Sequence, residues 1–423
     1  MQNHKVSPFF DGHLDISPPV TDEHLAKLPA RRGVALLLAE SDHPITLLPA
    51  ADIRSRVSAR MRNPEEDPRQ KMPDLRGITR RVEWKLTGGH FETDLCFLEL
   101  ARELWPDGYP KMLAFKKAAF VHVNPAEEFP RFVRTDDVFG QTGPCLGPFP
   151  SGRAADRFVE AVQEAFDLCR DYRCLRQSPR GVRCSYGQMG RCLCPCDGSL
   201  AMDAYRKAVA EAADYVAGSR SPLRDALTSQ MKQAAAGLQF EKAATLKARL
   251  ERLSAIDHED FRHVAPVEEF RFLLVQPGVS ARKMHVFAAS GGQIVQLPNL
   301  DYPLSDGPLQ VALETLSHAP TTPLPRDGAA LWRMALVSHY LYCSPERSGL
   351  VLRYRPDLTA RSLAEMNEDQ AVALRLVKPR RPPGEAPAPD PLECGGTEPK
   401  AHDTALDRGR STTEGTETTE GQK

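Results

Sequence analysis

Residues 174–196 read CLRQSPRGVRCSYGQMGRCLCPC, and the interpretation of the whole sequence starts from this stretch. Four of its cysteines follow the spacing C-x9-C-x7-C-x3-C, and a fifth lies inside the last loop. Thiolates are soft ligands, and short loops between them let several converge on one centre. Four arginines lie among these cysteines, and a nearby cation favours the ligating thiolate form. The expected metal ligands are Cys174, Cys184, Cys192 and Cys196.

Disulfide bonds in a secreted chain are the alternative interpretation of these cysteines. The first residues, MQNHKVSPFFDGHLD, lack the basic-then-apolar pattern of a secretory signal, and the chain of 423 residues is too long for a small disulfide scaffold. The longest apolar runs are too short to cross a bilayer. We therefore expect a cytoplasmic protein with reduced thiols and no membrane partner.

The charge balance limits the kinds of partner. Lysine and arginine together number 55 and aspartate and glutamate 56, so the formal net charge is −1. A nearly neutral chain is not a generic polyanion binder, and any nucleic-acid surface must be a local patch. The length allows about two to four domains, each with its own core.

The N-terminal part alternates between strand and helix patterns. Residues before about Leu28 contain prolines and are expected to be irregular. Two apolar runs around a Ser-Asp-His-Pro turn predict a hairpin, and basic and amphipathic helical segments follow. The expected strands are 33–39, 45–48, 82–86 and one within 113–123, and the expected helices are 50–62 and 92–104.

The middle of the chain is predicted to be mainly helical. The segment GPCLGPFP at 143–150 is rich in proline and glycine, which predicts a rigid turn. An amphipathic helix over 155–169 leads into the cysteine stretch, and a second helix over 202–217 follows it. Residues 221–256 carry two apolar stripes around Gly237, which predicts a helical hairpin. Because its stripes are narrow, this hairpin is expected to pack on a like hairpin, in its own dimer or in a partner, or alternatively to fold back on its own domain.

The C-terminal third has a weaker pattern. The expected strands are 270–276, 284–297 with a turn at 290–292, and 350–354, and the expected helix is 329–342. Asp301 and Asp306 are expected in a proline-containing loop. From about residue 378 onward apolar residues nearly vanish, which predicts a disordered tail.

These segments together resemble the C subunit of the bacterial UvrABC excinuclease, the UvrC family. CSYGQMGRCLCPC resembles the cysteine-rich linker of that family, although Tyr186 lies one place early. LRDALTSQMKQAAAGLQFEKAATLKARLERL resembles its UVR motif. FPRFVRTDDV and LGPFPSGRAADRFVEAVQEAF resemble the segments that join the nuclease domain to the cysteines. The resemblance spans about residues 28–256.

The resemblance implies that the N-terminal domain is a GIY-YIG-like nuclease. Such a site needs a metal-binding glutamate, an arginine on the phosphate and tyrosines that orient the attacking water. Arg56 and Glu99 fall at the arginine and glutamate positions. The two tyrosine positions hold Ala35 and Thr46, which cannot replace a phenol. Losing a general base costs about two to four orders of magnitude in rate, so we expect a degraded nuclease. As a lone pair, Arg56 and Glu99 could equally be solvated helix-surface residues.

The C-terminal region resembles only the opening strands of an RNase H-like domain, in MHVFAASGGQIVQL, and shows no helix-hairpin-helix signature. The resemblance therefore implies a short UvrC paralogue. It also implies an iron–sulfur cluster, of the 4Fe-4S type, at the four cysteines, where a zinc ion would use the same residues. Mg²⁺ would be needed for any cleavage.

The implied partners are DNA and a UvrB-like protein. Arginine contacts to phosphate would position DNA without reading its sequence. The expected DNA-binding residues are Arg54, Arg60, Arg183 and Arg191. The expected partner-binding residues of the hairpin are Leu227, Met231, Phe240, Glu241, Ala244 and Leu250.

The sequence thus predicts an α+β multidomain protein. The predicted regions are a GIY-YIG-like domain at 28–125, a cysteine-bearing linker at 126–218, a UVR hairpin at 219–256, a truncated α+β region at 265–376 and a tail at 378–423. The first functional hypothesis is a nucleotide excision repair factor, within the SOS response, with weak or lost nuclease activity. The second is an active Mg²⁺-dependent structure-specific endonuclease, and the third is a metal- or redox-sensing UVR protein without a DNA role.

Overall fold

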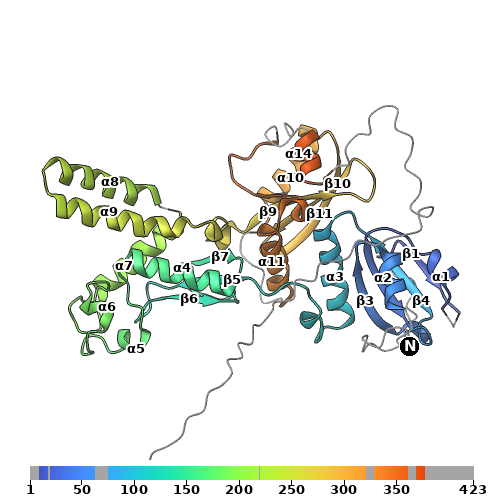
Figure 1. Ribbon diagram of the computed structural model, residues 1–423, viewed down its shortest axis with the longest axis horizontal. Helices are drawn as coiled ribbons and strands as arrows, with labels where there is room; N and C mark the ends of the chain where they lie inside the picture. Colours follow the sequence, from blue (N-terminus) through green and yellow to red (C-terminus); the bar gives the residue numbers. More distant parts are fainter. Residues whose placement is uncertain are drawn as a thin grey trace, which may run out of the picture. The chain divides into compact units, whose positions relative to one another are not determined.

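The computed structural model describes residues 9–17, 20–61, 75–218, 220–320, 328–360 and 368–376. These residues form three antiparallel sheets with helices between them, all within the unit Met1–Pro379 (Figure 1). The predicted α+β class is confirmed. The predicted disordered tail at 378–423 lies outside the described residues.

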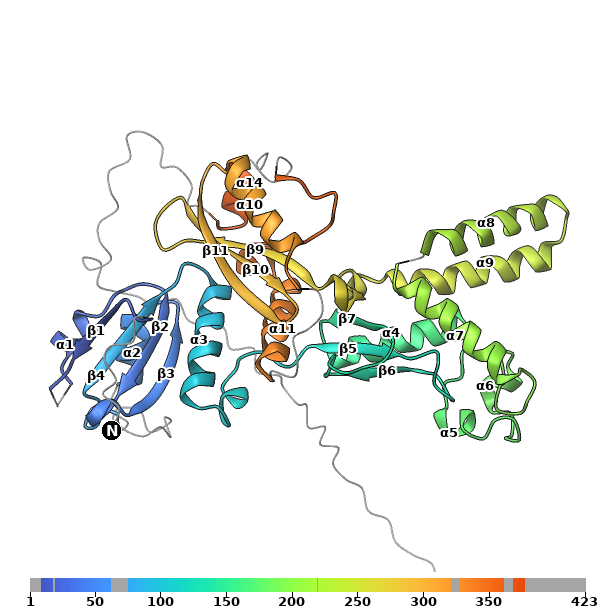
Figure 2. The same ribbon diagram turned by 180° about the vertical axis from the view of Figure 1, so that it is seen from behind.

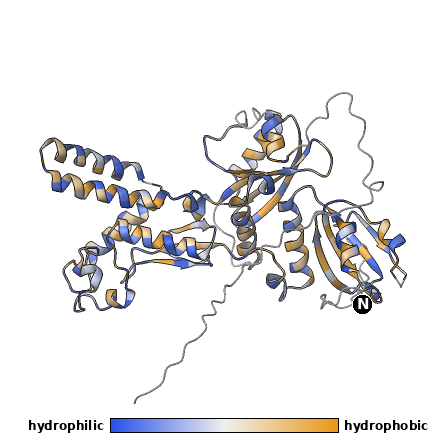
Figure 3. Ribbon diagram, in the orientation of Figure 1, coloured by the Kyte–Doolittle hydropathy of each residue, from blue (hydrophilic) through white to orange (hydrophobic). Residues whose placement is uncertain are grey.

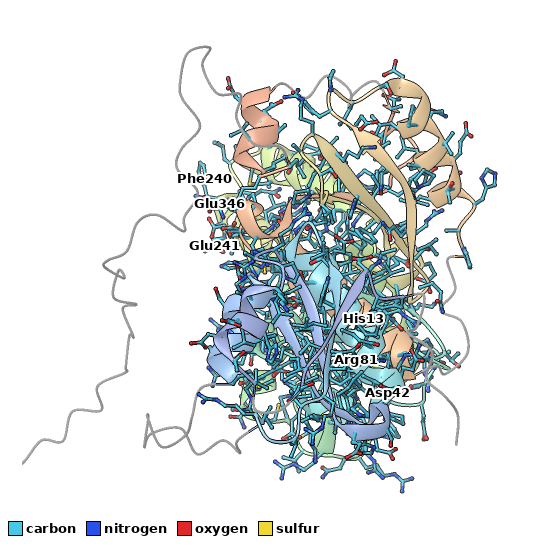
Figure 4. The ribbon with its side chains drawn as sticks, turned by 90° about the vertical axis from the view of Figure 1, so that its right-hand side faces the viewer. His13, Asp42, Arg81, Phe240, Glu241 and Glu346 are labelled. Carbon is cyan, nitrogen blue, oxygen red and sulfur yellow. The ribbon has the colours of Figure 1, made fainter. Side chains whose placement is uncertain are left out.

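The first sheet has the strand order β1-β4-β2-β3. Its strands are β1 Gly12–Asp15, β2 Gly33–Leu38, β3 Pro44–Ala50 and β4 Arg81–Leu86. The predicted hairpin is confirmed, because β2 and β3 pair antiparallel from Gly33 opposite Ala50. In β4, Arg81 pairs with Asp15 at 2.6 Å and with Asp42 at 3.3 Å, which ties the edge strand β1 to the turn before β3 (Figure 4).

The expectation of irregular structure before Leu28 is wrong. The short strand β1 pairs with β4, with Gly12 opposite Trp84. The helix α1 (Asp22–Ala26) follows and begins at a capping box on Thr21. A four-residue strand takes its stability from its neighbour in the sheet, so its own sequence carries little signal.

The two helices of this region cover opposite faces of the first sheet. Alternate strand residues point to opposite faces. One face packs Ala35 and Leu37 against α2 (Ile53–Arg60), whereas the other packs Val34 and Leu36 against α3 (His90–Leu104). In Figure 3 the strands between these helices are largely hydrophobic.

The far side of α3 packs on the C-terminal region. Phe91 is fully buried, and its ring lies 5.4 Å from the rings of both Phe287 and Tyr340. The C-terminal sheet has the order β11-β10-β9-β12. Its strands are β9 Arg271–Pro277, β10 Lys283–Ser290, β11 Gln293–Asp301 and β12 Leu350–Arg353, and its helices are α10 Asp306–Ser317, α11 Gly328–Leu341, α12 Pro345–Ser348 and α14 Glu368–Ala373.

The predicted loop around Asp301 and Asp306 is also wrong. Asp301 ends strand β11 opposite Lys283, and Asp306 is the first residue of α10. The glycine and proline at the start of α10 suggest a loop in the sequence, but the first turn of a helix tolerates both residues.

The middle sheet has the order β6-β5-β7-β8. Its strands are β5 Ala119–Val123, β6 Phe132–Thr135, β7 Cys145–Phe149 and β8 Ala265–Pro266. The predicted rigid turn at 143–150 is therefore wrong over β7, whose five residues are all buried. A Cβ at Gly147 would lie 2.4 Å from the Phe120 ring, so glycine is needed where β5 and β7 approach.

Four helices complete the middle region, and two more form the predicted hairpin. The middle helices are α4 Gly152–Ala165, α5 Tyr172–Leu175, α6 Ser185–Gln188 and α7 Met202–Val216. The hairpin consists of α8 Arg220–Ala236 and α9 Phe240–Ser254, which lie side by side in both views (Figures 1 and 2). Short 3-10 turns occur at Glu40–Asp42, Tyr109–Lys111, Ala255–Asp257, Glu259–Phe261 and Val267–Glu269.

Candidate functional site

The two ends of the cysteine stretch are held together by backbone and side-chain contacts. Gly181 donates its backbone N–H to the Cys196 carbonyl at 2.8 Å, and the Ser178 hydroxyl donates to the Pro195 carbonyl at 2.7 Å. Arg183 then pairs with Asp197 at 2.7 Å. These contacts fold the 23-residue stretch into a closed loop that begins at α5 and contains α6.

The five cysteines of this loop differ in exposure. Cys192, Cys194 and Cys196 are buried, whereas Cys174 and Cys184 are partly exposed, and all five are free thiols. Burial raises the pKa of Cys196, and the charges of Asp197, Cys192 and Cys184 act on it as well. Within the described residues, no three His, Cys, Asp or Glu side chains gather closely enough to hold a metal ion. The donor types fit a thiolate-bound centre, but their arrangement does not bring the four predicted ligands together.

Cys169 is a member of this region that the spacing argument missed. It follows α4 in the chain, is buried, and lies beside Cys192. The neighbouring Cys169 thiol lowers the pKa of Cys192 to about 6, while Cys192 and burial raise the pKa of Cys169. The Cys169 thiol donates to the Asp171 carbonyl at 3.3 Å. Cys169 precedes the quoted stretch by five residues and occupies the apolar face of a helix pattern, so its sequence signal is that of a core residue.

An unsatisfied arginine lies next to these thiols. The guanidinium of Arg170 sits over the Tyr186 ring at 4.6 Å, and its Nε and Nη2 atoms are buried without a hydrogen-bond partner in the described part of the chain. Its positive charge contributes to the lowered pKa of Cys192. A half-buried cation without an ion-pair partner in the described residues is costly. Negative charge on nearby thiolates would offset that cost.

The nuclease-like positions are not brought together. Ala35 is buried in the core under α2 and pairs with Leu48 in the first sheet. Thr46 pairs with Leu37. Arg56 is exposed on α2, whereas Glu99 lies on α3, on the other face of the sheet.

Glu99 is instead held by two arginines. Arg333 of α11 donates to both carboxylate oxygens of Glu99, with N–O distances of 2.6 and 3.1 Å. Arg102, one turn along α3, adds a contact of 2.9 Å. The Arg333 side chain is 11% exposed and that of Glu99 29%, so this ion pair is largely shielded from water.

The predicted DNA-binding arginines have different surroundings. The Arg54 Nε donates to the Leu28 carbonyl at 2.8 Å, and Arg60 is half-buried on the same helix. Arg183 is engaged by Asp197, whereas Arg191 is exposed and lies 4.0 Å from Glu164. Arg191 therefore has the most accessible charge of the four predicted residues.

The hairpin is anchored at its base and exposed at its tip. Leu227 is buried in the middle core, and Met231 and Leu250 are half-buried. Glu241 and Ala244 are exposed on α9, and Phe240 at the first position of α9 is 65% exposed (Figure 4). Leu238 in the connecting turn is exposed as well. The predicted partner-binding residues thus include both anchoring and accessible side chains.

Two family models match the chain. Residues 119–215 match the middle domain of the UvrC/Cho excinuclease, and residues 223–256 match the UvrB/UvrC motif. Over these two segments the chain is similar to UvrC. The UvrC middle-domain match covers β5, β6 and β7 of the middle sheet and the cysteine stretch, and the motif match covers most of α8 and all of α9.

Curated proteins named UvrABC system protein C agree with this assignment. The protein from Hyphomonas neptunium is 26% identical over 274 residues, which are 65% of this chain and 44% of that protein. The protein from Desulforudis audaxviator is 29% identical over 236 residues, 55% of this chain and 37% of that protein. The protein from Pseudomonas protegens is 26% identical over 328 residues, 76% of this chain and 49% of that protein. This UvrC relative therefore spans about half the length of its curated relatives, or less.

No solved structure matches the chain. None of the helices in the described part of this UvrC relative has the length and apolar character of a transmembrane span.

Proposed function

We propose that this chain is a nucleotide excision repair factor that binds DNA and docks a UvrB-like protein through α8 and α9, with nuclease activity that is weak or lost. The observation that carries the proposal is the exposed aromatic residue at the tip of a hairpin that matches the UvrB/UvrC motif. Exposed aromatic anchors supply much of the affinity of protein interfaces.

The state of the nuclease positions supports weak or absent cleavage. Ala35 has no polar group and lies in the core, so it cannot orient water. Glu99 would have to release Arg333 before it could bind Mg²⁺. A nicking assay on a damaged duplex with Mg²⁺ tests this directly. We expect the wild type and Glu99→Gln to be equally inactive, and robust cleavage that is abolished by Glu99→Gln would establish the active endonuclease instead.

The docking surface is tested by the affinity for purified UvrB from the same organism. We expect Phe240→Ala to weaken binding by about 2 kcal/mol or more, because truncating an aromatic anchor typically costs that much. Val311 on α10 is also an exposed apolar residue outside the hairpin, so Val311→Ala is the matched control and should bind normally. Equal affinity of the wild type and Phe240→Ala would reject the hairpin tip as the contact.

A thiolate-bound centre in the cysteine stretch is part of the proposal. Cys174, Cys184, Cys192 and Cys196 would have to move closer together to hold an iron–sulfur cluster or zinc, and the bound centre would then fix the loop next to the middle sheet. Metal analysis and the absorbance spectrum of anaerobically purified protein test this. Comparing Cys174→Ser with Cys169→Ser shows which thiol accompanies the other three, and protein without iron or zinc contradicts the centre.

A redox-responsive docking protein without a DNA role is the second candidate. The contact between the Cys169 and Cys192 thiols favours it, because a thiol with a lowered pKa next to a second thiol is susceptible to oxidation. Salt-dependent DNA binding separates the two candidates, since phosphate contacts weaken steeply as salt rises. Absence of DNA binding at low salt would favour the second.

A further inference from the structure

A cavity of about 530 Å³ opens where the start of α3 meets the C-terminal sheet. Its wall includes Arg32, just before β2, and the Gly88–His90 step into α3. The other side is formed by the turn between β9 and β10, by α12 and by residues after α14. This volume is in the range of pockets that hold small organic ligands. Neither family match includes these segments.

Arginines dominate the charge of this cavity. Four of them line it together with a single carboxylate, that of Glu346 on α12. Figure 4 labels the Glu346 side chain. Arg375 pairs with Glu346 at 2.9 Å. Arg282 stacks on the Tyr302 ring at 4.9 Å. The cavity therefore has an excess of positive charge.

Two of these arginines have no carboxylate within ion-pair distance in the described residues: Arg32 and Arg347. Arg32 lies within hydrogen-bonding distance of the imidazole of His90, with its two terminal nitrogens 3.2 and 3.3 Å from the two ring nitrogens. Burial lowers the pKa of Arg32, and burial with the charges of Arg32, Arg347 and Arg375 lowers the pKa of His90 to about 4. Arg32 is therefore half-buried without an ion-pair partner in the described residues, and the more distant charge of Asp94 offsets its burial only in part.

The first turn of α3 adds backbone donors to the same wall. The helix has 15 residues, and its cap, Gly89, provides no side-chain hydrogen bond. A Cβ at Gly88 would lie 1.9 Å from the Pro277 carbonyl oxygen, so only glycine allows β9 to approach this closely. Unsatisfied N–H groups and the helix dipole favour an anion at such a terminus. Glu92 is already engaged, since its carboxylate accepts from Gly88 N at 2.7 Å and contacts His285 at 2.9 Å.

A second, independent feature of the wall is an orphaned acceptor. Gln276 lines the cavity and is only 1% exposed. Its amide nitrogen donates to the Ser348 carbonyl, which fixes the orientation of the side chain, but its Oε1 atom has no hydrogen-bond partner among the described residues. A buried acceptor without a donor destabilises the folded state. A ligand that carries a hydroxyl or amino group would satisfy it.

We propose that this cavity binds one nucleotide unit, with its phosphate held by Arg32, Arg347 and the start of α3 and a sugar or base donor directed to Gln276. Guanidinium groups recognise phosphate through paired, charge-assisted hydrogen bonds. The nucleotide comes either as a free monophosphate or as part of a DNA strand. The second source rests on the DNA-binding role proposed above.

The test measures binding of three probes by calorimetry or fluorescence anisotropy: inorganic phosphate, dAMP and a short single-stranded DNA. The variants are Arg32→Gln, Arg347→Gln and their combination. Arg153→Gln is the matched control, because Arg153 is exposed on α4 and away from the cavity. Arg347 is exposed, so its variant should keep the fold, and thermal unfolding verifies this for every variant.

We expect each single cavity variant to weaken binding about tenfold, the combination more, and the control not at all, since losing one charge-assisted contact is about that large. Binding of dAMP with this pattern identifies a free nucleotide, and the same pattern with DNA alone identifies a strand. DNA binding that is equal in the wild type and the double variant overturns the cavity but leaves the repair role standing. If none of the probes binds, the proposed cavity site is wrong. If UvrB still binds through Phe240 in that case, only the DNA-binding part of the proposed repair role is wrong as well.

Discussion

The helix α3 and the hairpin α8–α9 make opposite use of their side chains. α3 is packed on both sides, and even its polar residues are engaged: Glu92 with His285, Asp94 with Tyr340 at 2.6 Å, and Glu99 with Arg333. The hairpin buries few residues and exposes Leu238 and Phe240 at its tip. Figure 3 shows hydrophilic residues spread along α8 and α9.

This difference in packing predicts that substitutions in α3 and in the hairpin affect different properties of the protein. The contacts of α3 are already made within the chain, so changing them should alter stability. The exposed residues of the hairpin make few contacts within the described chain, so changing them should alter binding to another molecule. Phe91 and Phe240 allow the cleanest comparison, because the same substitution at the two sites should give opposite results.

The largest expected effect is that of Phe91→Ala. This side chain is fully buried between α3, β10 and α11, and truncating a buried phenylalanine typically costs about 3–5 kcal/mol. Urea unfolding followed by circular dichroism measures the loss. A loss below about 1 kcal/mol would mean that α3 does not pack on the C-terminal region as described.

Arg333→Gln should have an intermediate effect. It leaves Glu99 largely shielded with only Arg102 as a partner, and we expect a loss of about 1–3 kcal/mol in the free energy of unfolding. Combining it with Glu99→Gln should restore part of this loss. Additive single losses in this double-mutant cycle would show that the two side chains do not interact.

The pH dependence near α3 should be smaller. The lowered pKa of His90 means that the unfolded state takes up its proton first, so stability should fall as pH decreases from about 6.5 to about 4. His263 has a similarly lowered pKa, caused mainly by burial, and adds to the same slope. His90→Gln should reduce the slope of unfolding free energy against pH in this window, and an unchanged slope would argue against a shielded His90.

Phe240→Ala should have the smallest effect on stability, within about 0.5 kcal/mol, because exposed substitutions rarely exceed this value. The same urea titration as for Phe91→Ala measures it. Destabilisation comparable with that of Phe91→Ala would show that the hairpin tip packs within this chain, and the docking proposal would fail.

The sequence predicted the elements with strong local patterns. The β2–β3 hairpin, the amphipathic α4 and the α8–α9 hairpin all appear where periodicity placed them. The failures have non-local causes. β1 is stabilised by its pairing with β4. β7 can pair with β5 because Gly147 has no side chain to collide with the Phe120 ring. No local window contains either partner.

The candidate sites were predictable to a smaller degree. Spacing pointed to the cysteine stretch, but it missed Cys169, which reaches Cys192 only through the fold. Motif comparison gave Arg56 and Glu99 as neighbours, whereas strand alternation puts α2 and α3 on opposite faces of the first sheet. The arginine-lined cavity combines segments about 240 residues apart, from Arg32 to Gln276, and has no sequence signature.

The route of the chain through the middle sheet has a practical consequence. Strand β7 ends at Phe149 and its neighbour β8 begins at Ala265, so the polypeptide leaves this sheet and later returns to it. The hairpin also starts and finishes at one point, since Arg220 and Arg224 both clasp Asp257, at 2.6 and 2.7 Å. These ion pairs hold the two ends of the hairpin together. A different helical hairpin could therefore replace α8 and α9 at this position. The docking specificity proposed for the hairpin would then be carried by an exchangeable segment.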